Sequence, residues 1–360
     1  MNTIKERNLN LDLIRCVALM MVPCLHGFDH TGLYSSALNT IPGGIMMVGK
    51  MLITCSIPLY LLLSGYLCSK KALSARYYLG LIRILGVYLL CGVACLAFEQ
   101  CSGIAHRSPV EMVSALVNFN CSDYAWYIMM YFGLFLMIPF LNMAYHGLKT
   151  QGQKLVLVAT FLALSVLPSL LNLYFQLYSL WWARLYPLCY YFTGAYLNEY
   201  MPKAKPGKWA AALLAFLAAY SVFFYFHYDA NGAALIGVYQ DTFPVYILSV
   251  LLFVTVFRLP LGTVPGPVAA ILRKVSDLTL PAYLLTWITD SLIYPRLMAA
   301  VTAGPARYPW LLLTVPLSLI FALLMAQVVD WIFVPINRLT KRLARKPIFS
   351  QNDLIGATHD

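Results

Sequence analysis

Long apolar segments separated by short polar loops run along almost the whole chain. A membrane-spanning helix needs about 20 mostly apolar residues, and ten segments reach or approach that length. These segments are 11–28, 45–68, 77–98, 124–145, 155–173, 181–199, 208–227, 243–258, 277–298 and 311–337. The pattern predicts an all-α membrane protein, a polytopic bundle of about ten transmembrane helices.

The composition excludes a soluble globular protein. Of the 360 residues, 61% are hydrophobic and 11% are charged, whereas about a quarter of the residues in globular domains are charged. No polar stretch is long enough for a separate soluble domain. We therefore expect one transmembrane domain over residues 1–340, followed by a basic and then polar tail over 341–360.

The lysines and arginines predict how the helices are oriented. Of the 25 basic residues, 18 lie in the N-terminus, in every second loop and in the tail. Three lie in the opposite loops and four inside predicted spans. Because basic residues concentrate in cytoplasmic loops, both termini are expected to be cytoplasmic. The net charge of +11 then reflects topology, and we expect the lipid bilayer rather than a nucleic acid as its partner.

The one long loop, 99–123, is expected outside. Its Ser108 to Glu111 spacing, with Pro109 between, matches a capping box and predicts a short helix over 109–117. Cys101 and Cys121 bracket this loop and either form a disulfide or stay free, since spacing alone does not decide it. None of the nine cysteines has metal-ligand spacing with histidines, and no metal is expected.

The first span carries three ionisable residues, Asp12, Arg15 and His26. Arg15 and His26 lie eleven residues apart, which places them within about 20° on a helix and about 16 Å apart along it. Asp12 lies within about 40° of the same face. Ionisable groups inside membrane helices usually face inward and often mark a functional site. The alternative is an i,i+3 ion pair between Asp12 and Arg15 at the membrane edge, with His26 in interfacial water.

The third span carries Arg76 and Arg83 on one face, with Arg83 at a depth similar to that of Arg15. Guanidinium groups bind phosphate with paired hydrogen bonds, so Arg15 and Arg83 on two helices predict a phosphate clamp. The alternative is that the arginines reach the lipid headgroups, an interpretation that suits Arg76 better than the deeper Arg83.

Two basic residues of other spans are expected near the outer end of the first span. Lys50 and Arg184 are candidates to bind an anionic or sugar acceptor beside His26, or alternatively to contact lipid phosphate.

Two acids inside later spans, Asp290 and Asp330, are each expected to pair with a base, and either could orient His26. Trp126 is typical of an interfacial aromatic belt, or alternatively of a surface on which a sugar stacks.

These residues carry a family resemblance. Leu11-Asp12, Arg15, ten residues and then His26 resemble the signature of the acyltransferase-3 family of integral membrane proteins. Four later stretches are similar to family motifs in the same order: Ile57–Leu67 ending Ser-Gly-Tyr-Leu, Arg83-Ile84-Leu85, Trp126–Leu141 and Tyr191–Tyr196. The chain departs from the family at two positions. Gly86 follows where a proline is usual, and Thr286 stands where a histidine is common.

The resemblance implies acyl transfer, usually of an acetyl group, from cytoplasmic acetyl-CoA to a hydroxyl of a cell-surface or lipid-linked glycan at the plasma membrane. His26 would be the general base and Asp12 would fix Arg15. The donor phosphates would contact three arginines, Arg15, Arg83 and Arg76. The acceptor would contact Lys50, Arg184 and Trp126.

Two other functions remain open at this point. One is a multi-pass transporter that exports a lipid or small metabolite without acyl transfer. Such a protein is often built from internal repeats with paired broken helices, and neither is evident in the sequence. The other is a membrane scaffold or sensor that catalyses no reaction, in which His26 would have no catalytic role.

Overall fold

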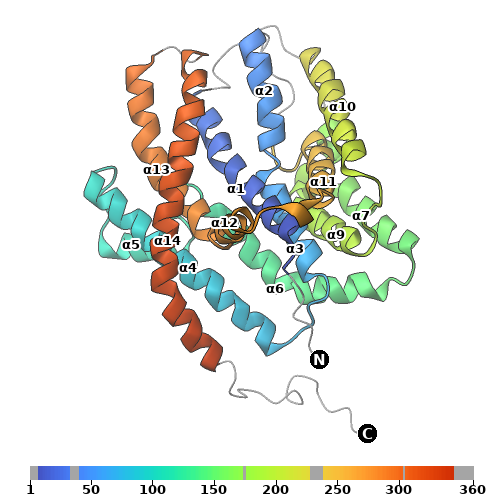
Figure 1. Ribbon diagram of the computed structural model, residues 1–360, viewed down its shortest axis with the longest axis horizontal. Coiled ribbons are helices and arrows are strands. Elements are labelled where there is room, and N and C mark those ends of the chain that lie inside the picture. Colours follow the sequence, from blue (N-terminus) through green and yellow to red (C-terminus); the bar gives the residue numbers. More distant parts are fainter. Residues whose placement is uncertain (1–6, 33–39, 173–175, 228–237, 303–304, 344–360) are drawn as a thin grey trace.

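The computed structural model describes residues 7–32, 40–172, 176–227, 238–302 and 305–343, and these ranges fold into helices joined by short connections, with no strand among them (Figure 1). The helices are α1 (Leu9–His30), α2 (Ile41–Ile53), α3 (Ser56–Cys68), α4 (Ala75–Ser102), α5 (Pro109–Val117), α6 (Trp126–Gly147), α7 (Gln151–Ser165), α8 (Pro168–Leu171), α9 (Tyr186–Glu199), α10 (Pro206–Tyr225), α11 (Phe243–Phe257), α12 (Gly266–Asp277), α13 (Thr279–Ala300) and α14 (Leu311–Leu343). Short 3-10 helices are η2 (Leu180–Leu185), η3 (Leu261–Thr263) and η4 (Pro305–Trp310).

The all-α membrane architecture is confirmed. Among the described residues, six helices are long and apolar enough to cross a membrane, and α11 is a shorter apolar helix. Each of the ten predicted segments is largely helical, but the second is divided into α2 and α3 at residues 54–55. The number of spans and the cytoplasmic termini stay predictions, as does the domain boundary at residue 340. Most of the expected tail, 344–360, lies outside the described residues.

Two features of the loops can be compared with the sequence. Helix α5 is present, and the side chain of Glu111 accepts from the backbone of Ser108 while Ser108 accepts from that of Glu111, so the predicted capping box is confirmed. Cys101 is exposed and Cys121 is buried, and both are free thiols. The possible disulfide is therefore not formed. The thiol of Cys121 lies 3.5 Å from the Tyr88 hydroxyl oxygen instead.

Helix α12 was not expected, because the sequence there was interpreted as a loop. It is short and amphipathic, and with its polar residues it has too few consecutive apolar residues to be predicted as a span. It packs against α1, where the Cys16 thiol lies 3.3 Å from the carbonyl oxygen of Leu272. This helix adds Ser276 and Asp277 to one end of α1.

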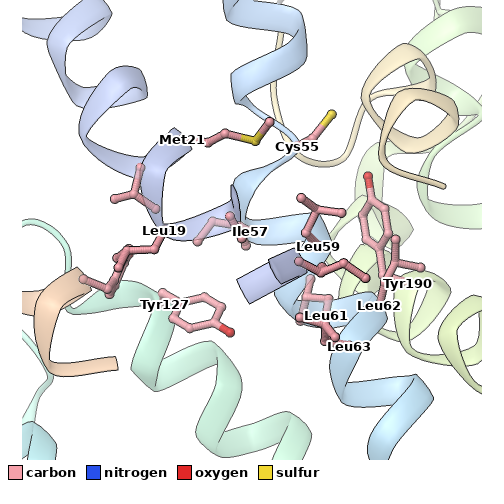
Figure 2. Packing of buried hydrophobic residues seen from close by; sticks show 14 of the residues in the cluster. Leu19, Met21, Cys55, Ile57, Leu59, Leu61, Leu62, Leu63, Tyr127 and Tyr190 are labelled. Carbon is pink, nitrogen blue, oxygen red and sulfur yellow. The ribbon is translucent and has the colours of Figure 1, made fainter. Parts of the chain in front are cut away.

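Helix α1 lies in the middle of the bundle (Figure 1) and packs against α2, α3, α11, α12, α13 and α14. The side chain of Asn8 accepts from the backbone of Asn10 and caps the start of the helix. The amide of Asn10 donates to the carbonyl oxygens of Val256 and Leu259, which attaches the start of α1 to the end of α11. Figure 2 shows α1 residues Leu19 and Met21 in the apolar cluster with the start of α3.

Helices α3 and α9 cross with their backbones in very close approach. A Cβ atom on Gly65 would lie 2.0 Å from the carbonyl oxygen of Tyr191, and one on Gly194 would lie 2.1 Å from that of Leu62. Only glycine permits these distances, and small residues allow close packing of membrane helices. The Ser-Gly-Tyr and Thr-Gly-Ala stretches therefore hold α3 against α9.

We predict that Gly65→Ala and Gly194→Ala each destabilise the protein by about 1–3 kcal/mol or more, because backbone must shift to admit the added methyl group. The measurement is the thermal midpoint of the detergent-solubilised protein. Gly133→Ala is the matched control, since a Cβ atom at Gly133 of α6 meets nothing within 4 Å. Equal midpoints for all three variants would contradict the close crossing.

Candidate active site

His26 lies near the end of α1, and its imidazole contacts a buried carboxylate. The Nδ1 atom of His26 is 3.1 Å from Oδ2 of Asp290 on α13. The His26 side chain is 13% exposed and that of Asp290 is 1% exposed. Of the two acids that could orient His26, Asp290 is therefore the one in contact with it. Asp330, the other acid considered, pairs with Lys274 at 3.0 Å.

The Asp290 carboxylate accepts two further hydrogen bonds. The Tyr124 hydroxyl donates to Oδ2 at 2.8 Å, and the Ser318 hydroxyl donates to Oδ1 at 2.7 Å. An ionised carboxylate only accepts hydrogen bonds, so Nδ1 of His26 carries the proton. Nε2 is then the unprotonated nitrogen in the neutral ring, and it has no hydrogen-bond partner within the described part of the chain.

The Tyr124 ring also fixes the plane of the imidazole. Its centroid lies 3.6 Å from that of His26, and the two planes differ by 20°. The Tyr124 hydroxyl lies 3.3 Å from Nε2 of His30, one turn further along α1. His26 is thus held by a carboxylate hydrogen-bond partner on one edge and by a stacked ring on one face, so its orientation is strongly constrained.

A polar cavity of about 200 Å³ adjoins His26. Its polar and aromatic lining comes from α1, from the start of α3, from the segments just before α6 and α11, and from α13. These side chains include His26, Asp29, Ser56, Asp123, Trp126 and Gln240. Trp126 thus lines the same cavity as His26, and its contact with an acceptor stays a prediction. Asp29 pairs with the buried Lys50, so the lysine charge is compensated at the edge of this cavity.

Asp12 occupies the opposite end of α1. Arg7 donates to both oxygens of its carboxylate, at 2.7 Å and 2.6 Å, and Ser276 donates at 2.7 Å. The expected pair with Arg15 is present but longer, at 3.3 Å. Asp12 and His26 lie fourteen positions apart in sequence, about 21 Å along the helix. Asp12 therefore positions Arg15 and Arg7 and does not contact the imidazole.

Arg15 lines two further cavities. The larger, of about 460 Å³, includes Arg7, Asp12 and Lys70. The smaller, of about 290 Å³, is lined mainly by apolar and tyrosine side chains, including Tyr127 and Tyr283. Tyr283 also lines the cavity at His26. Three cavities therefore follow α1 from Arg7 to His26, the first two sharing Arg15 and the last two sharing Tyr283.

The structure does not bring the other predicted basic residues into these cavities. Arg76, Arg83 and Arg184 are exposed and are not among the lining residues. Ile84 lines the cavity beside Arg15, and on a helix its neighbour Arg83 points about 100° away. The expected clamp of Arg15 and Arg83 is therefore not formed. The second arginine at Arg15 is Arg7, which lies before α1.

A metal site has no support from the described residues, where no group of three or more His, Cys, Asp or Glu side chains is placed to hold an ion. Sequence reasoning missed four polar participants: Arg7, Tyr124, Ser276 and Ser318. Arg7 stands close to Asp12 in sequence and was available as a candidate. The other three come from distant parts of the chain, and no local pattern marks them.

One of the comparisons with known proteins found a match. A family model described as an acyltransferase domain matches residues 8–332, nearly the whole chain. The match includes α1, His26, Asp290 and all three cavities apart from Arg7. The searches of curated proteins and of solved structures found no match. The chain belongs to the acyltransferase-3 family of membrane acyltransferases.

Proposed function

We propose that this membrane acyltransferase is an O-acetyltransferase of the plasma membrane. It takes an acetyl group from cytoplasmic acetyl-CoA and transfers it to a hydroxyl of an extracytoplasmic or lipid-linked glycan. The observation that carries the proposal is the row of cavities between Arg15 and His26, which follows one helix through the bundle. A donor bound at one end would extend along this row towards the base at the other.

His26 acts as the general base on the acceptor hydroxyl. Asp290 holds the Nδ1 proton, so the lone pair of Nε2 is available to take a proton. Histidine is the side chain that most often serves as a general acid or base in enzymes. The ionised Asp290 also stabilises the imidazolium that forms when the proton is taken, as a carboxylate does in other His–Asp pairs.

Arg15, Arg7 and Lys70 bind the phosphates of the donor. All three line the cavity of about 460 Å³, and cationic side chains favour phosphate by charge and hydrogen bonding. The pantetheine arm extends from there through the tyrosine-lined cavity towards Tyr283. The distance from Arg15 to His26 along α1, about 16 Å, is within the reach of that arm.

The acceptor binds in the polar cavity at His26. Trp126 offers an aromatic face to a sugar ring, while Asp123 and Gln240 offer hydrogen-bond partners to its hydroxyls. The sole observation that favours a transporter is the interrupted helix α2–α3, since transport sites often lie at broken helices. A carboxylate fixed on an imidazole beside a cavity is the arrangement of a general base, and the family match is to an acyltransferase domain, so acyl transfer accounts for more of the observations.

His26→Ala should abolish transfer of the acetyl group, because the acceptor hydroxyl then has no base. The assay supplies radiolabelled acetyl-CoA to inside-out membrane vesicles and measures label in the glycan fraction. We expect a loss of about 100-fold or more. Unchanged labelling by this variant would remove the assigned base, whereas acceptor that crosses the membrane unlabelled would favour the transporter.

Asp290→Asn should lower kcat by about 100-fold to 10,000-fold, because an amide no longer holds the Nδ1 proton or stabilises the imidazolium. The measurement is the initial rate at saturating acetyl-CoA. Asp330→Asn is the control. Asp330 is an acidic residue of α14 that pairs with Lys274 and lines none of the three cavities. An equal effect of both substitutions would indicate a general loss of fold.

Arg15→Gln should raise KM for acetyl-CoA by about 10-fold to 100-fold, the cost of one charge-assisted hydrogen bond to phosphate. Arg83→Gln should change KM little, since that exposed side chain lies outside the cavity. Titration of the initial rate against acetyl-CoA distinguishes the two. A large effect of Arg83→Gln alone would restore the clamp that the sequence suggested and contradict the present arrangement.

A further inference from the structure

The interruption between α2 and α3 lies beside the His26 cavity. Helix α3 begins at Ser56, and both Ser56 and Ile57 line that cavity together with His26. The start of α3, a helix of 13 residues, therefore lies beside His26, the proposed general base. Figure 2 shows Cys55 and Ile57, the two sequence neighbours of Ser56.

The hydroxyl of Ser56 has no hydrogen-bond partner in the described structure, although the residue is 0% exposed. The buried Ser122 hydroxyl likewise has no partner in the described residues, whereas two other buried serines do have partners. Ser64 of α3 donates to the carbonyl oxygen of Tyr60, and Ser249 of α11 donates to that of Val245. A buried hydroxyl without a partner costs stability, so the unmatched donor at the cavity requires an explanation.

The start of α3 is also electropositive and lacks a side-chain cap. Its N-cap residue, Cys55, makes no capping hydrogen bond. Its thiol lies instead near the carbonyl oxygens of Met51 and Val245. The aligned peptide dipoles of a helix give its start a partial positive charge that favours an anion.

The rest of the cavity does not suit a permanent anion. Asp29 and Asp123 line it, and the carboxylate of Asp290 lies directly behind His26. Lys50 compensates Asp29, and Trp287 donates to Asp123 at 3.4 Å, which leaves the net charge of the lining negative. A negative charge that exists only during the reaction fits this setting better than a charged ligand.

We infer that Ser56 is a further catalytic residue, whose hydroxyl donates a hydrogen bond to the oxyanion formed during acyl transfer. The inference rests on the proposed function. Nε2 of His26 takes the proton of the acceptor hydroxyl, and the acceptor oxygen forms a bond to the thioester carbonyl carbon. The carbonyl π electrons move to its oxygen, which the Ser56 hydroxyl and the start of α3 stabilise.

The intermediate then collapses without any further reactant. The carbonyl double bond re-forms, the carbon–sulfur bond breaks with its electron pair on sulfur, and the thiolate takes the proton from Nε2. The products are the acylated acceptor and the free thiol. Ser56 keeps its own proton throughout, because it acts as a hydrogen-bond donor and not as a nucleophile.

The experiment compares Ser56→Ala, Ser56→Thr and Ser249→Ala with the parent chain. Radiolabelled acetyl-CoA and inverted vesicles that contain the native acceptor are used, and kcat and KM for acetyl-CoA are measured separately. Removal of one oxyanion donor typically lowers kcat about 100-fold to 1,000-fold. We expect that loss for Ser56→Ala with KM unchanged, substantial recovery in Ser56→Thr, which keeps a hydroxyl, and parental rates in Ser249→Ala.

Two outcomes would overturn this role while leaving the proposed function in place. The first is a parental kcat for Ser56→Ala in a protein whose transfer still requires His26. The second is an equal loss in Ser56→Ala and Ser56→Thr accompanied by a lower thermal midpoint, which indicates packing. If the parent chain transfers no label at all, the proposed function fails first, so the two failures are distinguishable.

Discussion

The buried carboxylate of Asp290 is the group on which the arrangement of the site depends. A charge inside an apolar bundle is costly unless it is paired and hydrogen-bonded. Here the donors come from three different parts of the chain: His26 of α1, Tyr124 before α6 and Ser318 of α14. Satisfying this one carboxylate therefore fixes the position of α1 against α13 and α14, and at the same time fixes the tautomer of the imidazole.

A second charged cluster, at the other end of α1, is built on the same principle. Asp12 is fully buried and is compensated by Arg7 and Arg15, with Ser276 of α12 as a further donor. The two clusters are separated by a cavity whose lining is mainly apolar and aromatic. The ionisable groups are thereby concentrated at the two ends of one helix, an arrangement that suits the donor proposed above.

Much of the arrangement of these two clusters could be predicted, because several of the residues that form them lie on a single helix, α1. The spacing of Arg15 and His26 and their position on one helix face follow from helical geometry. The inward direction of that face follows from the cost of ionisable groups in lipid. The same reasoning was wrong for Arg83, because which face of α4 turns inward depends on packing. Gly86 receives the ring of Phe333, since a Cβ atom there would lie 2.5 Å from it. That contact and Ile84 place Arg83 outside the cavity.

Long-range partners and helix interruptions were beyond what the pattern could predict. Tyr124 and Ser318 lie 166 and 28 residues from Asp290 in sequence, and a tyrosine or serine in an apolar segment has no signal of its own. Helix α12 was missed because it is short, begins with Gly266-Pro267 and ends in charged and polar residues, which is typical of a loop between spans. The division of the second span at 54–55 was missed because its hydropathy is continuous.

The close crossing of α3 and α9 explains how the division between α2 and α3 contributes to the site. Gly65 and Gly194 allow the two backbones to touch, so α3 is anchored along its length by a neighbour that cannot shift without a clash. The start of α3 is then held at a fixed place relative to α1, against which it also packs. A continuous straight helix would present ordinary hydrogen-bonded backbone to His26. An interrupted and anchored helix instead presents a hydroxyl without a partner and the positive end of a dipole, and both are in place before any charge develops. Preorganisation of this kind is what makes electrostatic stabilisation effective, because the donors need no rearrangement during the reaction.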